Sequence, residues 1–353
     1  MSRPPSDLAL WRVEHGGLDV RELRALGLDP EQVVDLSANL HPEPTPRAVI
    51  EAMLTADVSR YPDPEAAPLR EAIARAHDLD PASIVITPGS AAAIYLALAA
   101  LLREVRTCTV FAPTFGEYAP AVQTAGGIVR RVETRAPEFD IDDVPETPVT
   151  VLCNPNNPTG RYLDRAAVEA VLARTGHLVI DAAYEPFAEA RWDADDLVRE
   201  GAPVTVIHSF TKIFAMPGVR LGYVVAPPDI AREITRRQPP WPAGAHAMAA
   251  GLAALEVADA RIATMPSVHA RRRRIEATFT ASDARTTDAR ANFVLAEVGD
   301  APAFRAALLR RGFAVRDATS FSLPRWVRLA VPSEAQLPRL LQAIPGALGE
   351  IVR

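Results

Sequence analysis

A lysine among small, hydroxyl-bearing and apolar residues gives the first sign of chemistry. Lys212 follows the apolar run 204–207, which predicts a buried strand. Arg220 follows further along, and an amine desolvated beside another cation loses its proton near neutral pH. Such an amine attacks a carbonyl and forms an imine, so Lys212 is a candidate nucleophile. An isolated lysine in a loop is more often a surface residue, but the pattern around Lys212 favours the chemical interpretation.

The neighbours of Lys212 are suited to binding a phosphate group. Ser209 and Thr211 offer hydroxyl groups, and Arg220 offers a planar, permanently charged guanidinium. A carbonyl and a phosphate on one small ligand suggest pyridoxal 5′-phosphate.

A second anion site is expected where a strand at 84–87 passes through a glycine turn into an apolar helix. Ser90 and Ala91 open this helix, and the free N–H groups of a helix N-terminus bind anions. Most turns of this kind are only helix caps, so this signal is weak by itself.

The remaining candidates also follow strand-like runs. Asp181 could keep a pyridine nitrogen protonated, Asn157 and Tyr184 could donate to a phenolic oxygen, and Tyr118 could offer an aromatic face to a ring. Apolar strands that alternate with helices predict a mainly parallel sheet covered on both faces. Ligands bind at the carboxyl ends of such strands, where these residues fall.

The composition is that of a soluble globular enzyme. The 353 residues are 48% apolar and 23% charged, and the net charge of −6 favours neither nucleic acid nor an anionic membrane as partner. Cys108 and Cys153 are too few for a disulfide framework or a zinc site, so we expect no metal. No apolar run spans a bilayer and no secretory signal is visible, which predicts a cytoplasmic protein.

The order of elements predicts three regions. Residues 1–35 form an arm that packs on the small domain or on a partner subunit, and residues 36–240 form the large ligand-binding domain. A proline-rich break at 239–242 precedes a long helical region at 245–280. Residues 241–353 therefore form the interdomain helix and a small α+β domain, in which segments 293–296 and 326–330 are antiparallel strands.

Three segments in this order resemble a known family. They are Asn-Pro-x-Asn-Pro-Thr-Gly at 154–160, Asp-x-Ala-Tyr at 181–184 and Ser-x-Thr-Lys-x-x-x-x-Pro-Gly-x-Arg-x-Gly-Tyr at 209–223. They resemble the pyridoxal-phosphate enzymes of fold type I in the class I/II aminotransferase family, and the resemblance covers essentially the whole chain. It implies an α/β fold with a mostly parallel seven-stranded sheet and a small C-terminal α+β domain. It also implies a homodimer with shared active sites.

The resemblance implies a role for each candidate. Lys212 would form the imine with the cofactor aldehyde, Asp181 would pair with the ring nitrogen, and Tyr118 would stack on the ring. Tyr184 and Asn157 would hold the phenolic oxygen. The cofactor phosphate would be bound by Ser90, Ala91, Ser209, Thr211 and Arg220, and by Tyr61 of the partner subunit.

Two subgroups are the most similar, the threonine-phosphate decarboxylases of cobalamin biosynthesis and the histidinol-phosphate aminotransferases. The decarboxylases look closer, on the segments 15–17, 35–42, 60–63, 115–118, 240–241 and 292–293. By that resemblance Arg328 would pair with the substrate carboxylate. Arg316, with His15 and Asn39 nearby, would meet a distal anionic group of the substrate; the alternative for Arg316 is a surface salt bridge.

The chain departs from these relatives at Ala182, where they usually carry glutamate, in the bare turn at 89–93, and at Pro332, where the decarboxylases often have a second arginine. These departures affect the substrate pocket rather than the cofactor chemistry. Decarboxylation of L-threonine O-3-phosphate to an aminopropanol phosphate is the preferred hypothesis. The alternatives are transamination of histidinol phosphate, elimination or replacement on another amino acid in secondary metabolism, and a cofactor-binding module without catalysis.

Overall fold

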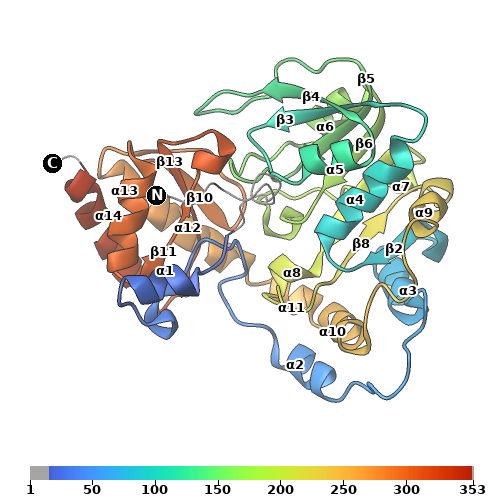
Figure 1. Ribbon diagram of the computed structural model, residues 1–353, viewed down its shortest axis with the longest axis horizontal. Coiled ribbons are helices and arrows are strands. Elements are labelled where there is room, and N and C mark those ends of the chain that lie inside the picture. The colour runs from blue at the N-terminus through green and yellow to red at the C-terminus, as the bar shows by residue number, and fades with distance from the viewer. Residues whose placement is uncertain (1–15, 352–353) are drawn as a thin grey trace, which may run out of the picture.

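Seven strands form the central sheet, in the order β2-β8-β7-β6-β5-β3-β4 (Figure 1). Neighbouring strands are parallel except where β8 pairs with β2 and β7. The expected mostly parallel sheet is therefore confirmed. The computed structural model describes residues 16–351. The strands are β2 (Ile84–Thr87), β3 (Thr107–Ala112), β4 (Ile128–Glu133), β5 (Thr147–Cys153), β6 (Thr175–Asp181), β7 (Val204–Ser209) and β8 (Gly222–Val225).

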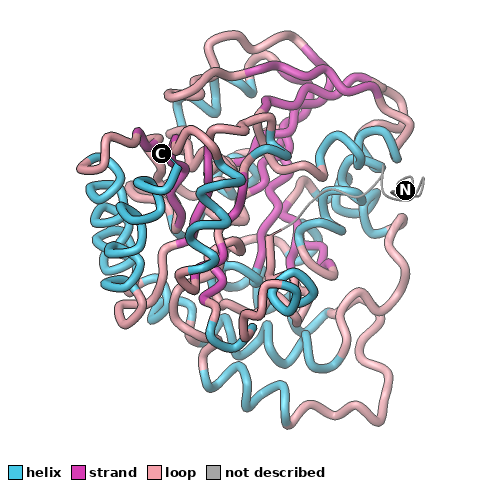
Figure 2. Tube along the Cα trace, turned by 60° about the vertical axis from the view of Figure 1, so that its left-hand side comes forward, coloured by secondary structure: helices cyan, strands magenta, loops and turns pink. Residues whose placement is uncertain are grey.

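Helices lie on both sides of this sheet (Figure 2). Side chains alternate along a strand, so Val206 of β7 packs into one cluster of buried apolar residues and Ile207 packs into another. A strand covered on both faces is apolar throughout, which explains the continuous runs in the sequence. The helices around the sheet are α2 (Arg47–Leu54), α3 (Ala67–Ala76), α4 (Ser90–Leu101), α5 (Tyr118–Thr124), α6 (Arg165–Leu172), α7 (Asp195–Arg199), α8 (Phe210–Ile213), α9 (Pro228–Thr235) and α10 (Ala245–Glu256), with the short 3₁₀ turns η3 (Pro81–Ser83) and η4 (Glu185–Phe187).

The C-terminal part contains a second sheet, in the order β12-β13-β10-β9. Its central strands β10 and β13 pair antiparallel, with Leu295 opposite Arg328, as the sequence predicts for these segments. The elements of this part are β9 (Arg285–Thr286), β10 (Phe293–Glu297), α13 (Ala301–Arg310), β11 (Phe313–Ala314), β12 (Arg316–Asp317), η5 (Thr319–Phe321), β13 (Trp326–Ala330) and α14 (Leu337–Ile351).

The first described residues lie against this C-terminal part (Figure 1). Helix α1 (Val20–Ala25) and the turn η2 (Pro30–Gln32) lead to β1 (Val34–Asp35), which pairs in parallel with β11. Glu22 on α1 accepts hydrogen bonds from Arg305 on α13. The N-terminal segment is thus held by both backbone pairing and an ion pair.

The long helical region expected at 245–280 consists of three helices. After α10 come α11 (Ala258–Ile262) and α12 (Met265–Thr280). Pro266 stands in the first turn of α12, where a missing N–H costs nothing. The same proline could not continue α11, because it has no hydrogen bond to give and its ring would crowd the preceding turn.

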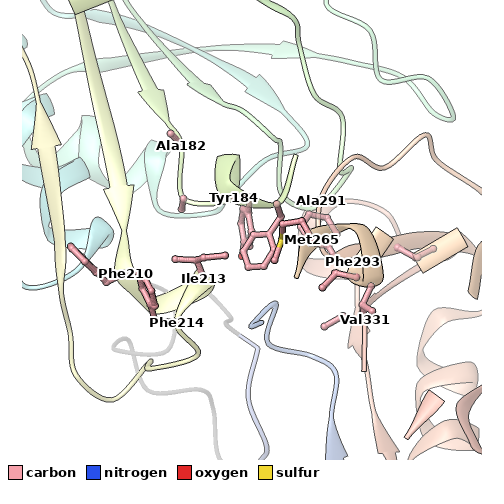
Figure 3. Close-up of a cluster of buried hydrophobic side chains, with 14 of the residues drawn as sticks. Ala182, Tyr184, Phe210, Ile213, Phe214, Met265, Ala291, Phe293 and Val331 are labelled. Carbon is pink, nitrogen blue, oxygen red and sulfur yellow. The ribbon is translucent and has the colours of Figure 1, made fainter. Parts of the chain in front are cut away.

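The two parts of the chain meet beside the C-terminal ends of β6 and β7. Figure 3 shows Tyr184 and Ile213 from the large sheet side approaching Phe293 and Val331 from the C-terminal side. The rings of Tyr184 and Phe293 pack edge to face, with centroids 5.3 Å apart. This apolar contact brings the strand ends of the large sheet next to β13.

Candidate active site

A cavity of about 700 Å³ opens at this junction, and most of the residues expected at the site line it. Tyr61 and Tyr118 do not line it, and His15 lies outside the described residues. The expected residues that do line it are Asn39, Ser90, Ala91, Asn157, Asp181, Tyr184, Ser209, Thr211, Lys212, Arg220, Arg316 and Arg328.

Lys212 lies on the single-turn helix α8 that directly follows β7. Its Nζ is 5.9 Å from the centre of the Tyr184 ring. Burial, and then the positive charges of Arg328 and Arg220, lower the pKa of Lys212 to about 8, while Asp181 opposes the shift. The amine is therefore much easier to deprotonate than an ordinary lysine, as a nucleophile requires.

Asp181 ends β6 and is buried beneath the cavity. Its Oδ2 accepts a hydrogen bond of 2.7 Å from the Tyr118 hydroxyl, and its Oδ1 accepts one of 3.0 Å from the N–H of Ala183. Burial raises the pKa of Asp181, whereas these donors and the charge of Lys212 act against the rise. A carboxylate held in this way is suited to pair with a protonated ring nitrogen.

Tyr118, which is expected to stack on the cofactor ring, lies next to Asp181. Its side chain is fully buried and its hydroxyl donates to Oδ2 of Asp181. Helix α5 begins at Tyr118 and turns the side chain under the cavity. Phe115, in the loop before the helix, lines the cavity instead and packs edge-on against Tyr118 at 5.7 Å. The sequence motif holds both aromatic residues, and its spacing alone could not rank them.

The turn before α4 forms a cradle that excludes side chains. Gly89 has φ +91°, and a Cβ there would lie 2.6 Å from Nη2 of Arg220. A Cβ on Gly222 would lie 2.9 Å from the N atom of Ser90. The Ser209 hydroxyl is buried without a hydrogen-bond partner among the described residues. The helix N-terminus, the guanidinium and this orphaned hydroxyl fit a phosphate group.

Arg328 forms the opposite wall of the cavity. It is buried on β13, donates to the carbonyl oxygen of Ser37 at 2.6 Å, and donates to Oδ1 of Asn157. Its Nε is buried without a partner in the described part of the chain. Burial lowers the pKa of Arg328 to about 10, and the charge of Arg316 adds to the decrease. Arg328 thus stays charged at neutral pH and has a donor left for a ligand.

Arg316 lies directly opposite Arg328 across the β12–β13 pair. It is half-buried, lines the cavity, and donates from Nη2 to Oγ of Ser320 at 2.7 Å. Asn39 is close by, with Nδ2 3.4 Å from the Tyr184 hydroxyl and Oδ1 buried without a described partner. The cavity therefore has a cationic wall across from the lysine.

Tyr61 stands apart from this cavity within the chain. It lies in the segment between α2 and α3, which runs along the lower edge of the molecule in Figure 1. Its side chain is 83% exposed and its ring lies 4.9 Å from that of Trp241.

Among residues 16–351, no group of three or more acidic, histidine or cysteine side chains is arranged to hold a metal ion. The helices of that same span include none long and apolar enough to cross a membrane.

Comparison with known proteins agrees with this geometry. The family model of class I and II aminotransferases matches residues 31–344. The chain is 32% identical to the histidinol-phosphate aminotransferase of Natronomonas pharaonis, over 96% of this chain and 98% of that protein. It is 31% identical to the threonine-phosphate decarboxylase of Salmonella typhimurium, over 97% of this chain and 98% of that protein. The solved structure of the histidinol-phosphate aminotransferase of Sinorhizobium meliloti with pyridoxal-5′-phosphate superposes with a TM-score of 0.83 at 21% identity, over 99% of both chains.

The fold and the cavity define an α/β enzyme whose ligand site lies at the strand ends, between two parts of one chain. The chain belongs to the class I and II aminotransferase family, whose enzymes depend on pyridoxal 5′-phosphate. The expected family, fold type, enzymatic nature and cofactor are thereby confirmed.

Proposed function

We propose that the enzyme acts at Cα of a phosphorylated amino acid, and that its reaction is decarboxylation of L-threonine O-3-phosphate to an aminopropanol phosphate. The observation that supports this is the pair of guanidinium groups, Arg316 and Arg328, facing each other on paired strands in one cavity wall. Phosphothreonine carries two anionic groups, a carboxylate and a phosphate. Arginine binds both kinds of group through its planar fork of donors.

The residues around Lys212 prepare the cofactor for this reaction. Pyridoxal 5′-phosphate, when bound, supplies an aldehyde for the lysine and a ring that accepts the electron pair of the bond broken at Cα. Asp181 would face the ring nitrogen, Tyr184 and Asn157 the phenolic oxygen, and Phe115 would cover the ring. The phosphate would be held by the cradle around Ser90, Ala91, Ser209, Thr211 and Arg220.

Arg328 is the group that selects the reaction. Its contacts with Ser37 and Asn157 fix the guanidinium beside the cavity, so a carboxylate bound to it takes a fixed direction. That direction decides whether the carboxylate or the proton leaves Cα. If the proton leaves Cα, Lys212 takes it up at Nζ and acts as general base.

The second candidate is transamination of histidinol phosphate. It is supported by the names of several relatives, which are histidinol-phosphate aminotransferases. In that case Arg316 and Arg328 would both bind the single phosphate of the substrate. Both reactions use the same cofactor residues.

The two candidates separate in assays with holoenzyme. O-phospho-L-threonine alone should release carbon dioxide, whereas transamination of histidinol phosphate requires 2-oxoglutarate as amino acceptor. Arg316→Gln should lower kcat/KM for O-phospho-L-threonine about 10- to 100-fold, the effect of losing a charge-assisted hydrogen bond. The same variant should leave any turnover of unphosphorylated L-threonine unchanged. Amino transfer without carbon dioxide release would reject the decarboxylase.

We also propose that two copies of the chain form the active sites together, with Tyr61 reaching the phosphate cradle of the other subunit. Large apolar side chains are exposed along α2 and the segment after it, as at a subunit interface. They are Ile50, Leu54, Val58 and Tyr61, and the exposed Trp241, from the loop between α9 and α10, packs against Tyr61. Sedimentation should show a dimer. Tyr61→Phe should weaken cofactor binding but leave the dimer intact. A monomer with full cofactor affinity would reject this assembly.

A further inference from the structure

The segment that follows Arg316 forms part of the cavity wall, although neither candidate reaction gives it a role. Strand β12 ends at Asp317, and the 3₁₀ turn η5 begins two residues later. Residues 320–322 of this segment line the cavity, together with Arg316 and Arg328. The chain therefore places a turn next to the two arginines that are proposed to bind the substrate.

Hydrogen bonds within the segment fix the shape of this turn. Oδ1 of Asp317 accepts hydrogen bonds from the N–H of Thr319 at 2.8 Å and from its hydroxyl at 2.6 Å. The N–H of Phe321 donates to the carbonyl oxygen of Ala318 at 2.9 Å. Ser322 follows with φ +64°, the left-handed conformation that ends the turn. Phe321 thus has a fixed place on the chain.

The ring of Phe321 contacts both guanidinium groups of the cavity wall. Cζ of Arg316 lies over the ring at 5.7 Å from its centre, and Cζ of Arg328 lies 6.0 Å from it. At these distances a cation is attracted to the electron-rich face of an aromatic ring. Arg328 also lies over the ring of Phe293, at 5.7 Å. Phe321 is therefore the side chain through which the two arginines share a contact.

The same ring is anchored on its other side. It is partly buried and packs against a small apolar cluster at the edge of the second sheet. The buried members of this cluster are Phe139, Leu295, Ala318 and Trp326. The cluster supports Phe321 from behind, so the ring cannot turn away from the arginines without losing this packing.

The contact matters because Arg316 and Arg328 carry the same charge on neighbouring strands. They are direct partners across the β12–β13 pair, where like charges repel each other. An aromatic ring beside both cations offsets part of this repulsion and keeps water from one side of each group. The N–H donors that the ring does not cover stay available to an anion in the cavity.

Ser320 adds a further donor at this place. Its Oγ accepts a hydrogen bond of 2.7 Å from Nη2 of Arg316, and the residue lines the cavity. A hydroxyl that accepts one hydrogen bond still has its own proton to donate. A phosphate group offers three strong acceptor oxygens, so it can receive the guanidinium and this hydroxyl together.

We propose that Phe321 is a positioning residue for substrate recognition, which keeps Arg316 and Arg328 side by side so that Arg316 and Ser320 receive the substrate's phosphate. Phe321 touches no reacting atom and acts through the two arginines. The inference rests on the proposed function in one respect, the binding of a phosphorylated substrate by Arg316. It does not depend on which reaction follows, because O-phospho-L-threonine and histidinol phosphate both carry a phosphate.

Two variants and a matched control test this role in the holoenzyme. Phe321→Leu removes the ring but keeps an apolar side chain, whereas Phe321→Tyr keeps the ring. Phe139→Leu is the control, because Phe139 belongs to the same apolar cluster but contacts neither arginine and does not line the cavity. Thermal unfolding of each variant checks that the fold is retained.

The first measurement is the affinity for inorganic phosphate by calorimetry, with the cofactor bound so that its own phosphate fills the cradle. Phe321→Leu should weaken phosphate binding roughly 5- to 30-fold, because two contacts that hold the arginines ready are lost. Phe321→Tyr and Phe139→Leu should bind phosphate like the wild type. A wild type that binds no phosphate, or a Tyr variant as weak as the Leu variant, would overturn the proposal.

The second measurement repeats the titration in the Arg316→Gln background. Only the contact with Arg328 remains there, so Phe321→Leu should weaken phosphate binding by no more than roughly 2- to 5-fold. Equal effects of Phe321→Leu in both backgrounds would show that the ring is only structural. Neither titration needs turnover. Failure of the decarboxylase assay would therefore leave the inference standing, whereas carbon dioxide release without this coupling would reject the role of Phe321 alone.

Discussion

At the scale of single residues, the charges around Lys212 determine when it can react. Its pKa is lowered from 10.5 to about 8, chiefly by burial and then by Arg328 and Arg220. Only the neutral amine attacks an aldehyde, so capture of pyridoxal 5′-phosphate by the apoenzyme should speed up as the pH rises and level off above about 8. Arg328→Met should move this midpoint upward. Stopped-flow absorbance measures the pH dependence of capture for the wild type and for the variant. A wild-type midpoint near pH 10 would contradict the lowered pKa of Lys212.

Glu185 should make stability depend on pH in the neutral range. Burial raises the pKa of Glu185 from 4.5 to about 7, so the folded state binds this proton more tightly than the unfolded chain. Stability that comes from the protonated form is complete below about 4.5 and is lost as the pH rises towards about 7.

The free energy of unfolding of Glu185→Gln, measured relative to that of the wild type, should therefore be higher at pH 8 than at pH 5. The gain is at most about 3 kcal/mol at 1.36 kcal/mol per pKa unit, and the loss of Arg191 as a distant partner reduces it. Urea unfolding at the two pH values measures the difference. Glu169→Gln, on the exposed face of α6, is the control, and it should change the free energy of unfolding by the same amount at both pH values. A Glu185→Gln gain independent of pH would contradict the assignment.

At the scale of elements, the start of α4 places the phosphate cradle. Gly89 adopts φ +91°, which side chains rarely allow, and it leaves room for the guanidinium of Arg220. Gly89→Ala should keep the fold but weaken binding of pyridoxal 5′-phosphate at least tenfold, because the new Cβ displaces Arg220. Gly218→Ala is the control, since a Cβ there meets nothing within 4 Å. Equal cofactor affinities in fluorescence titration would reject the role of the cradle.

At the scale of the whole molecule, buried arginines tie distant segments to the lysine. Arg261 of α11 donates to the carbonyl oxygens of Ile213 at 3.0 Å and Glu43 at 3.2 Å, and also to that of Pro44. The N–H of His41 donates to the carbonyl oxygen of Lys212 at 2.9 Å. The N-terminal loop, the lysine turn and the C-terminal helices are thus joined at one place.

Removal of Arg261 should loosen this junction. Arg261→Met would remove the donor of one buried carbonyl group, that of Ile213, and of two partly buried ones. A buried unpaired group costs about 1–3 kcal/mol and a partly buried one less, so a loss of roughly 2–4 kcal/mol is expected. Arg273→Met, on the exposed side of α12, breaks a surface ion pair with Glu189 and should cost less than about 1 kcal/mol. Chemical denaturation ranks the two variants. Similar losses would mean that Arg261 does not join the segments.

The sequence alone determined the parallel sheet and most of the residues that line the cavity. Lys212, Asp181 and Asn157 each follow an apolar run, and parallel strands of one sheet end at a common edge, so local patterns were sufficient to bring them together. The antiparallel pairing of β10 and β13 was predicted separately, from the two short strand-like segments of the C-terminal part.

Only the tertiary structure decided which way side chains turn and which distant segments touch. Tyr118 and Phe115 share one motif, yet the start of α5 turns Tyr118 beneath Asp181 and leaves Phe115 at the cavity. The hydroxyl of Tyr223 lies 2.9 Å from Nε2 of His77, and a separation of 146 residues leaves no periodic signal. Periodicity reports the face of an element that is buried, whereas a hydrogen bond between elements depends on how they pack against each other.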